Sequence, residues 1–164
     1  MPLVPLTDGW AVVVDCIVWA VWSTGVGYVM HRRPVSAFDH DTFWTRLRSF
    51  EADGRFWERT VRIKRWKHRL PEAGDFFDGG FDKKRLHGDD PAALERFVVE
   101  TRRAEVTHWV VLAAAPAFVL WNPWWLALVM ATFAVVANVP CLITQRYNRA
   151  RMMRILARRA RRSA

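Results

Sequence analysis

The sequence predicts an all-α membrane protein with three transmembrane helices and cytoplasmic, amphipathic interfacial helices. Apolar residues make up 52% of the 164 residues, and they concentrate in three segments, at about 10–30, 107–121 and 124–144. A helix that crosses a bilayer needs about 20 such residues. Lysine and arginine collect on one side of these segments. We therefore interpret residues 1–164 as a single membrane domain, with a cytoplasmic interfacial region at 31–106 and a basic cytoplasmic tail at 145–164.

The first apolar segment, 10–30, is interrupted only by Asp15 and small residues. A cleaved secretory signal has positive residues before a shorter apolar core. Here no lysine or arginine precedes Trp10, whereas Arg32 and Arg33 follow the segment. These features predict an uncleaved anchor. Asp15 is expected near its outer end, either paired within the bundle or facing a neighbouring chain.

The net charge of +9 is distributed asymmetrically. The loop around residue 122 and the N-terminal tail carry no lysine or arginine, whereas basic residues follow segments one and three and precede segment two. Because cytoplasmic loops are enriched in these residues, the N-terminus is expected outside the cell and the C-terminus in the cytoplasm. The protein is thus predicted to cross the membrane more than once.

Basic clusters beside a membrane span usually contact anionic lipid headgroups, and we expect that partner here. The chain has no recognisable nucleic-acid-binding motif, so nucleic acid is not an expected partner. A membrane-protein partner and a homo-oligomer both stay open. Cys16 and Cys141 lie in different apolar segments, which predicts neither a disulfide framework nor a zinc site. A soluble helical protein with 107–144 as its core is the alternative, and the lengths of the segments favour the membrane.

The interfacial region 31–106 mixes many aromatic residues with lysine and arginine, which suits headgroup depth. Within it, 41–50 resembles an amphipathic helix with Phe43, Leu47 and Phe50 on one side. The stretch 56–69 fits a strand and a helix equally well. Residues 74–91 are expected to be irregular, and Pro91 is a good first residue for a helix that runs into the membrane.

A polar site is predicted inside the apolar hairpin. Folding the chain about residues 122–123 brings His108 level with about position 137, so that Asn138 is its neighbour in depth. The same reflection places Glu105 near Pro140 and Glu100 near Gln145. Ionisable and amide groups are costly beside hydrocarbon and tend to be retained there for function.

These residue types suggest acyl transfer. Glu105 and His108 are three residues apart and share one helix face, so that a carboxylate can orient the imidazole as a general base. Asn138 is the candidate hydrogen-bond donor to an oxyanion. In the alternative interpretation, His108 binds a lipid phosphate, Glu100 and Glu105 pair with Arg102 or Arg103, and Asn138 satisfies backbone groups near Pro140. No metal site is predicted, because the Glu-x-x-His motif of di-metal bundles occurs only once.

A basic stretch at 62–69 is interleaved with aromatic and aliphatic residues. It suits either the phosphates of a nucleotide-like donor or lipid headgroups. The residues that we assign to substrate binding are Glu100, Arg102, Gln145, Arg146, Asn148, Arg62, Lys64, Lys67 and Trp66.

Four strings of residues between about 43 and 154 are distinctive. They are Phe50-Glu51-x-Asp53-Gly54-x-Phe56-Trp57-Glu58-Arg59, Ile63-Lys64-Arg65-Trp66-Lys67-x-x-Leu70-Pro71-Glu72, Glu100-Thr101-Arg102-Arg103-Ala104-Glu105-x-x-His108-Trp109, and Asn138-x-Pro140 followed by Gln145-Arg146-Tyr147-Asn148-Arg149. Together they resemble the glycosyl-4,4'-diaponeurosporenoate acyltransferase family of small bacterial membrane proteins.

The resemblance implies a membrane O-acyltransferase that esterifies a hydroxyl of a glycolipid or glycosylated isoprenoid with a fatty acyl group. The expected donor is acyl-CoA or an acyl carrier protein, with no bound cofactor, and the acceptor is a membrane lipid or glycolipid. The alternative is a non-catalytic lipid-binding or scaffold subunit of a membrane complex. An enzyme should have an enclosed groove lined by Glu105, His108 and Asn138 that a fatty chain can reach, whereas a scaffold should have these side chains engaged with one another and no cavity.

Overall fold

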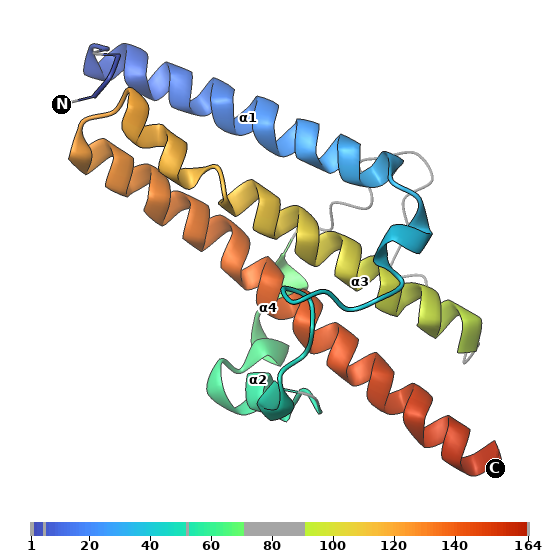
Figure 1. The fold of residues 1–164 in the computed structure, drawn as a ribbon. Coiled ribbons are helices and arrows are strands. Elements are labelled where there is room, and N and C mark those ends of the chain that lie inside the picture. The colour runs from blue at the N-terminus through green and yellow to red at the C-terminus, as the bar shows by residue number, and fades with distance from the viewer. Residues whose placement is uncertain (1, 5, 52, 71–90, 164) are drawn as a thin grey trace.

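Three long helices dominate the computed structural model, which describes residues 2–4, 6–51, 53–70 and 91–163 (Figure 1). They are α1 (Asp8–Arg32), α3 (Pro91–Leu112) and α4 (Trp124–Ser163), and a short helix, α2 (Arg55–Thr60), lies between the first two. The described ranges contain no strand. Three helical stretches, including α3 extended to Leu120, are long and apolar enough to cross a membrane. The predicted all-α membrane class is confirmed.

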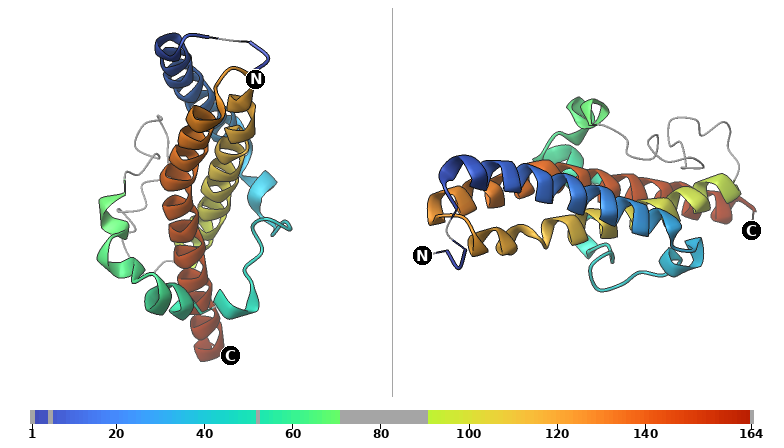
Figure 2. Two further views of the ribbon diagram at one scale, coloured as in Figure 1. Left: turned by 90° about the vertical axis from the view of Figure 1, so that its left-hand side faces the viewer. Right: turned by 90° about the horizontal axis from the view of Figure 1, so that it is seen from above.

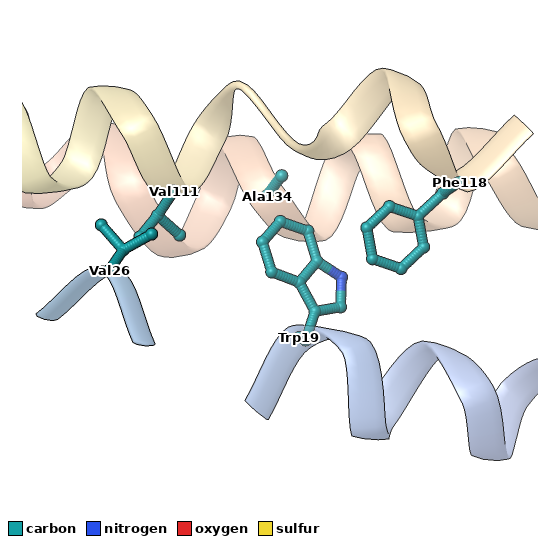
Figure 3. Close-up of a cluster of buried hydrophobic side chains, with 5 residues drawn as sticks. All are labelled: Trp19, Val26, Val111, Phe118 and Ala134. Carbon is teal, nitrogen blue, oxygen red and sulfur yellow. The ribbon is translucent and has the colours of Figure 1, made fainter. Parts of the chain in front are cut away.

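The three long helices lie side by side, with α3 and α4 forming an antiparallel hairpin and α1 packed against α3 (Figures 1 and 2). Trp19 of α1 stacks on Phe118 at a ring distance of 4.9 Å, within a small buried cluster. Figure 3 shows this cluster, which consists of Trp19, Val26, Val111, Phe118 and Ala134. Many other large apolar side chains of α1 and α4 are exposed, as expected of surfaces that face lipid.

The segment 107–121 is not one continuous helix. The α-helical part ends at Leu112, and Ala115–Leu120 forms a 3-10 helix, η7. Pro116 explains the break, because its ring clashes with the carbonyl of Leu112 and it has no N–H to donate. Asn122 then closes the turn by donating its backbone N–H to Phe118 O at 3.2 Å.

Helix α4 continues well past the end of the apolar segment at 144. It has 40 residues and is therefore about 60 Å long, twice the hydrocarbon thickness of about 30 Å. The basic tail predicted at 145–164 is thus the second half of one helix, through Ser163. Pro140 lies inside α4 without ending it, and Thr144 Oγ1 donates to the Pro140 carbonyl at 2.9 Å.

The segment between α1 and α3 contains short elements only. They are η1 (Val35–Phe38), η2 (Ser49–Glu51), α2, η3 (Ile63–Arg65) and η4 (Lys67–Arg69). The stretch 56–69 is therefore neither a strand nor one helix. Gly54 precedes α2 with φ of 77°, a conformation that favours glycine. Residues 74–90 of the stretch predicted to be irregular lie outside the described residues, and Pro91 begins α3.

The prediction of an amphipathic helix at 41–50 is wrong. The structure has a turn at 43–45, fixed by hydrogen bonds between Thr42 and Thr45, followed by η2. The backbone carbonyls of Trp44, Thr45 and Arg46 accept hydrogen bonds from arginines of α4. Those carbonyls are the acceptors that an α-helix would use internally, so the tertiary contacts replace the helix.

Asp15 is paired within the bundle, which is one of the two alternatives open from the sequence. Its Oδ1 accepts hydrogen bonds from Trp121 Nε1 and Asn122 Nδ2, both at 2.8 Å. The carboxylate is buried, and it attaches the turn at residue 122 to α1.

Candidate active site

His108 of α3 and Asn138 of α4 meet between the two helices. His108 Nδ1 lies 3.0 Å from Asn138 Oδ1, while Asn138 Nδ2 donates to the backbone carbonyl of Ala134 at 2.9 Å. Asn138 is 5% exposed and His108 is half-buried. The expectation that the two side chains meet is confirmed, because the antiparallel hairpin brings equal depths together.

Glu105 lies one turn before His108 on α3 and is fully buried. Its Oε1 accepts a hydrogen bond from Arg146 Nη1 at 2.5 Å, and its Oε2 lies 2.6 Å from Arg149 Nη2. Arg146 also pairs with Glu51, which is buried as well. Two carboxylates and two guanidinium groups therefore form a buried network without net charge. Buried ions need such partners, since removing charges from water is costly.

The arginines of this network also hold the segment 43–51 against α4. Arg146 donates to the carbonyls of Trp44 at 3.0 Å and Arg46 at 2.8 Å, and Arg149 donates to that of Thr45. The Trp44 ring packs against Trp109, the residue after His108, at 5.7 Å. Segment 43–51, which we call the strap, is thus fixed beside the His108–Asn138 pair.

The residues just before the strap are held by α3. Arg102 Nε donates to Asp41 Oδ1 at 2.6 Å, and its Nη1 donates to the carbonyl of Asp39 at 3.1 Å. Glu100, also buried, accepts a hydrogen bond from Arg96 Nε at 2.9 Å and lies 3.5 Å from Arg103 Nη1. Arg102 and Glu100 therefore have protein partners for their charges.

A second set of contacts docks α2 and the turns after it onto α4. Tyr147 donates its hydroxyl to Glu58 Oε1 at 2.9 Å, and its ring packs against Gly54, where a Cβ would lie 3.4 Å away. Lys67 Nζ donates to Asn148 Oδ1 at 3.1 Å and lies over the Tyr147 ring. The ammonium of Lys64, 2.8 Å from Glu58, and the Tyr147 hydroxyl hold the pKa of Glu58 below its ordinary value.

The remaining residues assigned to substrate binding lie on this docked segment or on α4. Arg62 and Lys64 are exposed, with Lys64 paired to Glu58, and Trp66 donates its Nε1–H to the Val61 carbonyl at 2.8 Å. Gln145 is half-buried on α4. The structure thus brings His108 and Asn138 together, places Glu105 among arginines, and leaves Arg62 and Lys64 on a separate exposed surface.

Sequence reasoning missed Glu51 and Arg149. Both are almost inaccessible to solvent, yet both carry charges. A signal was available, because a carboxylate at position 105 in an apolar hairpin requires a counter-charge. Arg146 and Arg149 are three residues apart on one helix face and are the first arginines after the third apolar segment. Within the described ranges, His, Cys, Asp and Glu form no cluster of three or more that suits a metal.

Comparison with known proteins identifies the family of this chain. A sequence profile of the family described as glycosyl-4,4'-diaponeurosporenoate acyltransferase matches residues 40–158. A Staphylococcus haemolyticus protein with that name is 32% identical over 135 residues, which cover 82% of this chain and 78% of the relative. A Staphylococcus aureus protein with the same name (strain USA300) is 29% identical over 147 residues, 88% of each chain. No solved structure matches.

The matched range includes the strap, α3, and α4 as far as Arg158, so it contains both partners of the His108–Asn138 pair and the whole Glu51–Arg146–Glu105–Arg149 network. The chain therefore belongs to the glycosyl-4,4'-diaponeurosporenoate acyltransferase family, and it is a membrane acyltransferase.

Proposed function

We propose that this acyltransferase esterifies a sugar hydroxyl of a glycosylated isoprenoid with a fatty acyl group. The relatives' names give glycosyl-4,4'-diaponeurosporenoate as the acceptor, and we take this compound as the first substrate to test. The observation that carries the proposal is the hydrogen-bonded His108–Asn138 pair between two apolar helices. It supplies a proton acceptor inside the apolar hairpin, eight residues or about 12 Å along α4 before Arg146.

We further propose that the reaction takes place in the cytoplasmic leaflet, with the N-terminus outside. Trp124 and Trp125 begin α4 and are exposed, as tryptophan often is at a membrane interface. Asn138 lies 14 residues further on, about 21 Å along a hydrocarbon layer of about 30 Å. Arg146 lies about 33 Å from Trp124, at headgroup depth. The excess of arginine at that end supports a cytoplasmic location.

In the proposed mechanism, His108 removes the proton from the acceptor hydroxyl as its oxygen attacks the carbonyl carbon of an acyl thioester. The carbon–sulfur bond breaks, and the leaving thiolate takes the proton from the imidazolium. The products are an ester and a free thiol, so no acyl-enzyme is required. The Cys141 thiol, the nearby nucleophile, contacts the Ala137 carbonyl of its own helix at 3.7 Å.

Substrate binding is assigned according to what each charge already contacts. The exposed cation Arg62, docked beside Asn148 through Lys67, is proposed to bind a phosphate of coenzyme A or of an acyl carrier protein. Lys64 is proposed to bind a second phosphate by exchanging its solvent-accessible partner Glu58, 2.8 Å away, for the donor. Trp66 supports their turn. Gln145 lies seven residues beyond Asn138, about 10 Å along α4, which is too far to act beside the His108–Asn138 pair. We assign Gln145 to the sugar of the acceptor.

Arg102, Arg146 and Glu100 act indirectly in this proposal. Arg146 has two carboxylates and two backbone carbonyls as partners, and a substrate phosphate would have to displace them. Glu105 balances the charges of Arg146 and Arg149. Because these two arginines hold the backbone of the strap, Glu105 positions the strap through them. A non-catalytic lipid-binding or scaffold subunit is the second candidate, because His108 and Asn138 engage each other and Glu105 is fully enclosed by the protein.

Replacing His108 by alanine tests the catalytic proposal. Cells that make the glycosylated acceptor but lack the acyltransferase would express the wild type or His108→Ala, and mass spectrometry of extracted lipids would measure the ester. General-base catalysis contributes about 10²- to 10⁴-fold, so the variant should form the ester at least about 10²-fold more slowly at equal protein level.

His40→Ala is the matched control, since His40 is exposed outside the site, and it should retain wild-type ester formation. Equal rates for the wild type and His108→Ala would exclude His108 as the base. Absence of any new ester with the wild type would favour the lipid-binding subunit.

A further inference from the structure

The carboxamide of Asn138 has its orientation fixed by the backbone. Nδ2 donates to the Ala134 carbonyl at 2.9 Å, and Oδ1 lies 3.0 Å from His108 Nδ1. Rotating the amide by 180° would place its oxygen against the carbonyl oxygen of Ala134, so that two acceptors faced each other. The hydrogen-bond network therefore determines which amide atom faces the imidazole.

An amide oxygen only accepts hydrogen bonds, so the ring nitrogen facing it must carry the hydrogen. In neutral imidazole one nitrogen is protonated and the other has the lone pair. A hydrogen on Nδ1 leaves the lone pair on Nε2. The geometry points to Asn138 as a positioning residue that holds His108 in the Nδ1–H tautomer, with Nε2 as the atom that takes the proton from the acceptor hydroxyl. The catalytic half of this inference rests on the proposed function, whereas the tautomer does not.

The same hydrogen bond is compatible with the whole proton transfer. When Nε2 takes a proton, the imidazolium has N–H groups at both nitrogens, and Nδ1–H still donates to Asn138 Oδ1. The ring therefore need not rotate between accepting and returning the proton. A neutral amide orients the base without placing a second ionised group in the apolar span, where charge is expensive. Glu105, one turn away, has its charge balanced by Arg146 and Arg149.

The helix packing supports this orientation. Ala134, whose carbonyl fixes the amide, is fully buried and belongs to the cluster with Trp19, Val111 and Phe118 (Figure 3). Trp19, Val111 and Ala134 come from the three long helices, so the carbonyl belongs to a residue at which all three pack together. The tautomer of His108 is thereby coupled to the association of α1, α3 and α4.

Nitrogen NMR of [15N]histidine-labelled protein in detergent micelles tests the tautomer directly. At about pH 8.5, well above the ordinary imidazole pKa of about 6.5, the His108 signals are those missing from His108→Gln. The wild type should show a protonated Nδ1 and an unprotonated Nε2. In Asn138→Leu, which removes the acceptor, both tautomers should be populated. In Asn138→Asp, which restores an acceptor oxygen, the Nδ1–H tautomer should return.

Ester formation, measured by lipid mass spectrometry, should follow the same order. Asn138→Leu should be at least about tenfold slower than the wild type, up to the full 10²- to 10⁴-fold of a lost general base. Asn138→Asp should be faster than Asn138→Leu. Asn122→Leu is the control for removal of a buried amide from the hairpin, and it should leave the His108 signals unchanged because Asn122 contacts Asp15 at the other end.

A protonated Nε2 with an unprotonated Nδ1 in the wild type would overturn the inference, and this measurement needs no variant at position 138. An unchanged tautomer in folded Asn138→Leu would overturn it too. Failure of the proposed function has a different signature, which is full activity of His108→Ala together with an Nδ1–H tautomer in the wild type.

Discussion

At the scale of single residues, Glu105 has the most constrained environment of the site. Its two carboxylate oxygens face two different guanidinium groups, and Arg149, one of these partners, is itself completely buried. Ion pairs of this kind contribute little net stability compared with apolar residues, but removing one partner leaves the other charge uncompensated. The strap depends on this pairing, because the same arginines hold its backbone.

Replacing Glu105 by glutamine should therefore destabilise the protein strongly. Removing one partner of a buried ion pair costs about 3–5 kcal/mol, and the free energy of unfolding in mixed micelles should fall by this amount. Far-UV circular dichroism during denaturant titration measures it. Glu95→Gln, on an exposed position of the same helix, should change it by less than about 0.5 kcal/mol. Equal stability of the two variants would show that loss of the Glu105 charge leaves no uncompensated arginine in the protein.

The meeting of His108 and Asn138 could be predicted from the sequence because it follows from reflection about a turn. An antiparallel hairpin of apolar helices brings equal depths together, and the break at Pro116 does not alter this. The partners of Glu105 could not be predicted in the same way, since arginine side chains reach across several ångströms of depth. Glu51 was still harder to predict, because its contact with Arg146 depends on how the strap packs against α4.

At the scale of elements, the short pieces between α1 and α3 depend on α4. The helix predicted at 41–50 has a plausible periodicity, but its carbonyls are taken by Arg146 and Arg149. Helix α2 has six residues, too few for an isolated helix to be stable in water. Local sequence therefore cannot determine these elements, whereas the long apolar helices follow from composition and length.

The docking of α2 should weaken in acid. The pKa of Glu58 is lowered in the folded protein by Lys64 and Tyr147, so the stabilisation is present above the pKa of the unfolded state and is lost as the pH falls through the folded-state pKa. Hydrogen exchange of residues 55–70, corrected for intrinsic rates, should accelerate below about pH 4.3, the ordinary pKa of glutamate.

Glu58→Gln should exchange faster at neutral pH and should lose this acid dependence. Asp39→Asn, an exposed acidic residue outside the contact, should keep the wild-type profile. An acid transition that survives in Glu58→Gln would assign the effect to another carboxylate.

At the scale of the whole molecule, the two ends of the bundle differ in chemistry. One end has the N-terminus, the turn at residue 122 and the Asp15–Trp121–Asn122 hydrogen bonds (Figure 1). The other end has Arg32, the strap and the basic half of α4. Along α4 the His108–Asn138 pair is nearer this basic end, because Asn138 is 14 residues from Trp124 and eight from Arg146. The orientation of the bundle therefore decides which leaflet supplies the acceptor and whether a cytoplasmic acyl donor can reach it.

Cysteine labelling in intact cells tests this orientation. In a background with Cys16 and Cys141 replaced by alanine, Leu3→Cys lies at the N-terminal end and Ala157→Cys on the basic half of α4, both at exposed positions. The positive-inside rule predicts that a membrane-impermeant maleimide labels Leu3→Cys in intact cells and Ala157→Cys only after lysis. Labelling of Ala157→Cys in intact cells would place the basic end outside. A cytoplasmic thioester could not then meet His108, and the acyl donor would have to be a lipid of the outer leaflet.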